Sequence, residues 1–196
     1  MKHHHRFAHH FRLDRFSFAH LGSVNGFAAL TTNRMIATMG WGMIGIFYPI
    51  FLYELFGQSL SIVFLYYAIM YGIRIPMYAI GAKIFSRIGL LPSMIIGQSG
   101  TALALLSYYA LEVGLFQVHT YVFLGVAIFG LLLNATLYWS PFHVDFAEVL
   151  TRGKRGRQVS IRYAIQRVIG VLAPIISAWI ILNHGYQFNF LLGVFV

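Results

Sequence analysis

Long uncharged apolar stretches dominate this chain and limit what it can fold into. Each is about 20 residues long, the length that a helix needs to cross the roughly 30 Å hydrocarbon core of a membrane. We place five full spans at about residues 33–53, 60–82, 92–113, 118–140 and 161–182, and a sixth that begins near Gln187 and is still apolar at Val196. Charged residues, Gly or Pro separate the spans, as turns require. The short alternating strands of a membrane β-barrel are absent from the pattern.

The composition supports this interpretation. Hydrophobic residues make up 59% of the 196 residues and charged residues only 10%, whereas soluble domains carry about 25% charged residues. We therefore predict an all-α integral membrane protein, a polytopic helical bundle of five full spans plus a truncated sixth. The chain has no cysteine, which excludes disulfides, thiolate metal sites and cysteine nucleophiles.

The basic residues predict the orientation of the bundle. Lysines and arginines gather in cytoplasmic loops, and here they occur before or at the start of the first span, after the second, and around the start of the fifth. They are Lys2, Arg6, Arg12, Arg15 and Arg34, then Lys83 and Arg87, then Arg152, Lys154, Arg155, Arg157, Arg162 and Arg167. These regions all fall on one side of the membrane, which places the amino terminus in the cytoplasm of a plasma (inner) membrane protein. The net charge of +9 then reflects contact with anionic lipid headgroups of the bilayer, and no nucleic-acid partner is expected.

Residues 1–28 are expected to form a basic, His-rich cytoplasmic tail. As a helix, this segment would place Phe7, Phe11, Phe18 and Leu21 on one face. An amphipathic helix lying in the membrane interface is therefore the alternative. Residues 29–196 would form the membrane-embedded bundle.

Two segments carry a resemblance to a known family. The first is Gly81-Ala82-Lys83-Ile84-Phe85-Ser86-Arg87-Ile88-Gly89, which we expect to be a tight cytoplasmic loop between the second and third spans. It resembles the loop motif Gly-x-x-x-Asp-Arg-x-Gly-x-Arg/Lys of the major facilitator superfamily, with Arg87 and Gly89 matching. Ala82 replaces the first Gly, Ser86 replaces the Asp, and Leu91 stands where a basic residue is usual.

The second segment is Ala173-Pro174-Ile175-Ile176-Ser177-Ala178 in the fifth span. It is similar to that family's Gly-Pro-x-x-Gly-Gly element, with each Gly replaced by another small residue. Small residues permit close helix packing in lipid, and proline bends a helix.

The resemblance implies a function and a set of gating residues. Residues 29–196 would be a fragment, the amino-terminal transmembrane bundle of a transporter whose carboxy-terminal bundle is missing. Such a transporter moves a small solute, with or without a coupled ion, by alternating access. The residues implied to form the conformational gate are Ala82, Ser86, Arg87, Gly89, Arg162, Arg167 and Pro174. Asp145 and Glu148, on the loop before the fifth span, would pair with the arginines of the gate.

Arg74 is the leading candidate for a binding residue. It lies about 14 residues into the second span, so roughly 21 Å from the outer end of that helix. Ionisable groups inside a membrane are expensive and mark functional sites. Arg74 would bind an anionic solute or pair with an acid of the second bundle. Alternatively, its side chain extends to the cytoplasmic headgroups.

Trp41, Asn134 and Tyr138 complete the candidate solute site. The resemblance implies that the first and fourth spans line the central cavity, which favours these three residues over Gln98 in the third span. Hydrogen bonding between helices is the alternative role for the polar groups among them. No metal or cofactor is expected, because a helix would place His143, Asp145 and Glu148 on different faces.

A different class of protein also has a signal in the sequence. Gly97-Gln98-Ser99-Gly100 spells Gly-x-Ser-Gly inside a span, as an intramembrane serine protease of the rhomboid type would need. Such chemistry requires a histidine within hydrogen-bond reach of the serine. His119 and His184 fall near the outer ends of their spans, whereas Ser99 is nearer the inner end of its own. We therefore expect no enzyme, and keep the protease and a non-catalytic membrane scaffold as alternatives.

Overall fold

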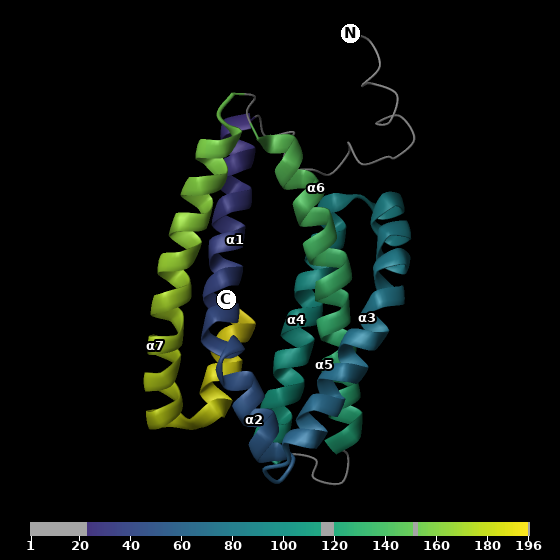
Figure 1. Ribbon diagram of the computed structural model, residues 1–196, viewed down its shortest axis with the longest axis vertical. Coiled ribbons are helices and arrows are strands. Elements are labelled where there is room, and N and C mark those ends of the chain that lie inside the picture. Colours follow the sequence, from purple (N-terminus) through teal and green to yellow (C-terminus); the bar gives the residue numbers. More distant parts are fainter. Residues whose placement is uncertain (1–22, 115–119, 151–152, 196) are drawn as a thin grey trace.

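The chain folds into a bundle of long helices (Figure 1). The computed structural model describes residues 23–114, 120–150 and 153–195. The elements within these ranges are all helical: α1 (Ser23–Gly45), α2 (Phe47–Leu55), α3 (Leu60–Ile88), α4 (Leu90–Glu112), α5 (Thr120–Leu133), η5 (Asn134–Trp139), α6 (Ser140–Val149) and α7 (Arg155–Phe195). The predicted tail at residues 1–28 lies mostly outside the described residues.

Five helical units are long and apolar enough to cross a membrane. They are Gly26–Leu55, Leu60–Ile88, Leu90–Glu112, Thr120–Val149 and Arg155–Phe195. The prediction of five apolar spans is therefore confirmed in number and order. The start of α1, the turn from α3 to α4 and the turn from α6 to α7 lie at the same end of the bundle (Figure 1). We call this end, which carries Lys83, Arg87 and Lys154–Arg157, the basic end.

The predicted loop Gly81–Gly89 is wrong in its extent. The α3 helix continues to Ile88, and only Gly89 separates it from α4. Gly89 has φ 98°, a backbone conformation that residues other than glycine rarely adopt. Ala82, Ser86 and Arg87 therefore lie on the last two turns of a helix.

The predicted break between residues 140 and 160 is also mostly helix. α6 covers Ser140–Val149, and α7 begins at Arg155. Asp145 and Glu148 consequently lie on a helix rather than on a loop, and Asp145 is fully buried. Pro141 misled the prediction because proline usually ends a helix.

The segment η5 leads directly into the helix that contains this proline. It is a π-helix, in which a carbonyl pairs with the N–H five residues later instead of four. Pro141 lies two residues after the end of η5, in the first turn of α6. The π-helix also carries Asn134 and Tyr138, two of the candidate solute-site residues.

Glycines hold α4 against α5 and η5. A Cβ built on Gly97 would lie 2.6 Å from the backbone nitrogen of Tyr138, and one on Gly100 would lie 2.6 Å from the carbonyl oxygen of Gly130. Small residues let membrane helices approach closely. The position of η5 is therefore fixed by direct backbone contact with α4.

The last helix turns back on itself at Gly185. This residue has φ 78° and ψ 173°, so α7 consists of two helical pieces joined at a kink. The Ser177 hydroxyl and the Asn189 amide, one from each piece, both donate to the carbonyl oxygen of Met43 on α1, at 2.5 and 3.2 Å. This network joins both pieces to α1.

Three tyrosines join the helices near the opposite end. The hydroxyl oxygens of Tyr48 (α2), Tyr66 (α3) and Tyr108 (α4) lie 2.6 to 2.8 Å from one another, and all three side chains are buried. In a closed ring each hydroxyl can donate once and accept once. The three hydroxyls therefore satisfy each other away from water.

Candidate functional site

A cavity of about 300 Å³ lies between α1, α3 and the α5–η5 helix. Its lining includes Trp41, Tyr67, Tyr71, Arg74, Asn134 and Trp139. We call it the Arg74 cavity. Three of the four candidate solute residues, taken from the first, second and fourth spans, therefore meet in one place.

Arg74 lies at the middle of α3. The helix runs from Leu60 to Ile88, so 14 residues separate Arg74 from each end. The Cζ atom of its guanidinium lies 5.8 Å from the ring centre of Tyr71 and 5.6 Å from that of Tyr78, one turn before and one turn after it. The guanidinium therefore lies close to aromatic rings on both neighbouring turns of α3.

Two hydrogen-bond donors in this cavity lack a partner among the described residues. They are Nε of Arg74 and Nδ2 of Asn134, and both atoms are buried. Asn134 is only 3% exposed. A buried donor without a partner costs about 1–3 kcal/mol, so the fold retains two unfavourable groups at the same cavity. Each donor would meet an acceptor bound in the cavity only after its side chain turns toward that space.

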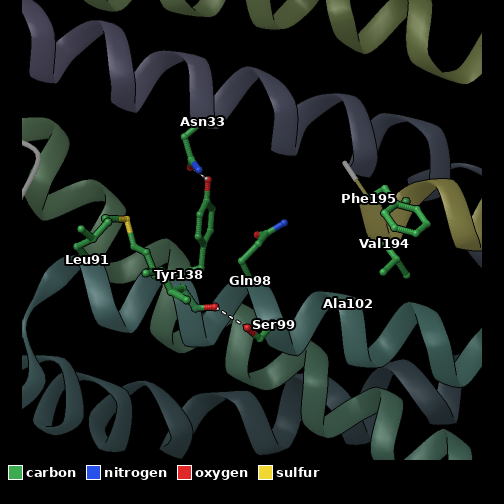
Figure 2. Close-up of a pocket in the computed structure, with 11 residues that line it drawn as sticks. Asn33, Leu91, Gln98, Ser99, Ala102, Tyr138, Val194 and Phe195 are labelled. Carbon is green, nitrogen blue, oxygen red and sulfur yellow. Dashed lines mark hydrogen bonds between the residues drawn. The ribbon is translucent and has the colours of Figure 1, made fainter.

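Tyr138, the fourth candidate, lies elsewhere. It lines a second cavity of about 430 Å³ together with Gln98 and Phe195, which we call the Tyr138 cavity. Figure 2 shows the Tyr138 ring reaching from η5 toward α1, where its hydroxyl donates to Oδ1 of Asn33 at 3.1 Å. Gln98 points into the same space, and its Oε1 is buried without a partner. The sequence-based choice of Tyr138 over Gln98 therefore separates two residues that the structure places together.

Two of the arginines that predicted the orientation, one of them a proposed gate residue, are buried near the basic end. Arg34 is 6% exposed and Arg162 is 4% exposed. The Cζ atom of Arg34 lies 4.0 Å from the ring centre of Trp139, and that of Arg162 lies 4.3 Å from the ring centre of Phe146. Cation–π contacts of this kind stabilise a desolvated cation by about 2 kcal/mol. Both arginines thus pack against the η5–α6 helix from α1 and α7.

Most of the other proposed gate residues lie at the surface, whereas Gly89 is buried. Ala82, Arg87 and Arg167 are exposed, and the Ser86 hydroxyl donates to the carbonyl oxygen of Lys83 at 2.9 Å. Arg167 lines a third cavity, of about 310 Å³, with Thr38 and Gln166.

Pro174 is half-buried. Its neighbour Ala173 packs against α1, where a Cβ added to Gly42 would lie 2.8 Å from the Ala173 Cβ. The small-residue element therefore supports the contact between α1 and α7.

The residues of the alternative protease interpretation do not form a visible pair. The Ser99 hydroxyl donates to the carbonyl oxygen of Ile95, in its own helix, at 3.0 Å. The ring of His184 lies 6.1 Å from that of Trp179 and 5.3 Å from that of Phe188. His119 lies outside the described residues.

Comparisons with protein-family models, with curated proteins and with solved structures found no match to this chain.

Proposed function

We propose that this chain is one bundle of a secondary transporter that moves a small solute by alternating access. The observation that carries the proposal is the Arg74 cavity, where Nε of Arg74 and Nδ2 of Asn134 are buried without a partner among the described residues. Cavities between broken helices near the midplane are where secondary transporters bind their solutes.

An internal symmetry supports the same function. The sequences Gly72-Ile73-Arg74-Ile75-Pro76 and Gly170-Val171-Leu172-Ala173-Pro174 both read Gly-x-x-x-Pro. They lie in the second and fifth spans. If the two pieces of α7 are counted separately, these are the second helices of two three-helix halves. Pairs of helices interrupted by Gly and Pro at corresponding positions are typical of transporters built from inverted repeats.

The first helices of the two halves are also irregular at corresponding places. The first span breaks at Ile46, between α1 and α2, and the fourth contains η5. The first span starts at the basic end, whereas the fourth ends there (Figure 1). The two halves therefore run in opposite directions, as an inverted repeat requires.

The proposed partner is a second bundle that packs on α3 and α7. These two spans are the least covered of the five. Gly72 and Gly170 lie on them with open space where a Cβ would be. Glycine inside a helix costs about 1 kcal/mol relative to alanine, and close packing against another bundle would account for that cost. In this arrangement the basic end is cytoplasmic, in the plasma (inner) membrane.

Cysteine accessibility tests the proposal, because the chain has no cysteine of its own. Trp41→Cys places a thiol in the Arg74 cavity. Sealed vesicles of either orientation are treated with a membrane-impermeant thiol reagent. Alternating access predicts labelling from both sides, whereas a scaffold predicts labelling from one side or neither. Arg157→Cys and Tyr121→Cys, at opposite ends, are controls that should each react from one side only.

A pore would also expose Trp41→Cys to both sides. Ion currents across a planar bilayer distinguish the two, because a transporter is never open to both sides at once and carries no channel-like current. Labelling from a single side would contradict the proposed function, and so would a steady pore current.

A further inference from the structure

The Arg74 cavity has the charge of an anion site. Arg74 is the cation in its lining, and none of the described residues that line it is acidic. Arg74 is half-buried, and a partly desolvated cation without a counter-charge is costly in an apolar environment. A ligand that brings one negative charge would neutralise it.

The second unpartnered donor indicates which chemical group of a ligand the site would bind. Asn134 lies on η5 and lines the same cavity as Arg74 on α3. Its Nδ2 can donate to the same acceptor group that Arg74 binds, since a carboxylate offers two oxygens with about four lone-pair positions. The two donors together therefore suit a carboxylate or a similar oxyanion.

The remaining walls favour an apolar, flat ligand body. Five aromatic residues line it, and Met70, Leu131 and Leu132 add apolar surface; the five are Trp41, Tyr48, Tyr67, Tyr71 and Trp139. Aromatic rings pack favourably against other rings, beyond the area that they bury. The volume of about 300 Å³ is at the lower end of the range for ligand pockets, so the body must be small.

We propose that the Arg74 cavity binds a small organic monoanion, with its oxyanion on Arg74 and Asn134 and its apolar or aromatic body against the tryptophans and tyrosines. This inference rests on the proposed function, in which that anion is the transported solute.

Three probes of one shape test the charge requirement on the unmodified protein. Benzoate, benzamide and benzylammonium share a ring and differ in charge. Calorimetry and thermal unfolding of the purified protein should show binding of benzoate at least tenfold tighter than that of benzamide, and no binding of benzylammonium, because hydrogen bonds to charged groups are the stronger ones. Equal binding of benzoate and benzamide, or no binding of benzoate, would overturn the proposal.

Acetate and phosphate test the aromatic body. Acetate should bind at least tenfold more weakly than benzoate, because it lacks the ring that the aromatic walls cover. Phosphate binding as tight as that of benzoate would overturn the assignment of an apolar body.

Variants locate the site. Arg74→Gln and Asn134→Leu should each weaken benzoate binding, Arg74→Gln by tenfold or more. Arg157→Gln and Asn183→Leu are the matched controls, since both residues are exposed and distant in sequence from the cavity. Unchanged benzoate binding in Arg74→Gln would overturn the proposal. If that variant does not fold, Arg74→Lys and the probe series on the unmodified protein decide the question.

The outcomes separate this inference from the proposed function. Benzoate binding at Arg74 without two-sided labelling of Trp41→Cys would leave an anion site in a protein that is not a transporter. Two-sided labelling without anion binding would leave a transporter with a different solute.

Discussion

Replacing Gly97 with alanine should destabilise the bundle by forcing α4 away from η5. A Cβ at this position would lie 2.6 Å from the Tyr138 nitrogen and 2.9 Å from the Leu137 carbonyl carbon. Both are backbone atoms, so no side-chain rotation can make room. Overpacking of this kind typically costs about 1–3 kcal/mol.

Gly125→Ala is the matched control. Gly125 lies on α5, and nothing lies within 4 Å of the position that its Cβ would take. Both substitutions gain about the same helix propensity, close to 1 kcal/mol. The difference between the two variants is therefore the overpacking cost alone, about 1–3 kcal/mol.

Thermal and denaturant unfolding of the two purified variants in detergent, followed by circular dichroism, measures this difference. We expect Gly125→Ala to be at least as stable as the original protein and Gly97→Ala to be clearly less stable. Equal stability of the two variants would refute the inference that backbone contact with α4 fixes η5, and with it the account of how Asn134 is positioned.

Three further predictions concern the tyrosines, the cavity and the end of α3. Tyr108→Phe should cost about 1–3 kcal/mol in thermal unfolding, because each remaining hydroxyl of the ring loses a buried partner, while Tyr121→Phe, at an 86% exposed position, should change nothing. Arg74→Ala should abolish transport while membrane insertion stays intact, and Arg74→Lys should be nearly as damaging if the guanidinium binds the solute in a bidentate way. Normal uptake by the alanine variant would mean that Arg74 contacts lipid headgroups and not the solute. Ala82→Leu should leave the unfolding temperature unchanged but reduce transport, since Ala82 is exposed. Gly81→Leu should instead unfold the bundle, because a Cβ there would lie 2.8 Å from that of Thr136. The reverse pattern would contradict the assignment of Ala82 to a surface facing a second bundle.

The sequence was sufficient to predict the number and order of the apolar helices, because length and hydropathy determine them. It was insufficient to predict the residues at which these helices begin and end. Polar residues such as Asp145 suggested a loop, yet this aspartate is buried on α6. Arg34 and Arg162 were grouped with the basic residues of the cytoplasmic side, and the sequence did not show that aromatic rings on η5 and α6 cover them. Burial of a charge depends on tertiary contacts that hydropathy alone does not contain.

The candidate site was partly predictable for the same reason. Arg74 was identifiable because a cation inside an apolar span is unusual. Its position in one cavity with Asn134 and Trp41 depends on the π-helix, which turns Asn134 and Tyr138 to other directions than an α-helix would. Nothing in the composition of the segment marks that change. The tyrosine ring requires three residues from three helices to converge, and no local pattern marks that convergence.

Entrance counterflow in proteoliposomes tests the central claim most directly. Vesicles containing the protein are loaded with the unlabelled solute that most raises its unfolding temperature in a screen of small organic anions and other solutes. They are then diluted into a trace of the labelled solute. A carrier with alternating access predicts that the label accumulates transiently above its equilibrium level and that Arg74→Ala abolishes this overshoot. Equilibration without an overshoot, or no entry of the label, would contradict the account.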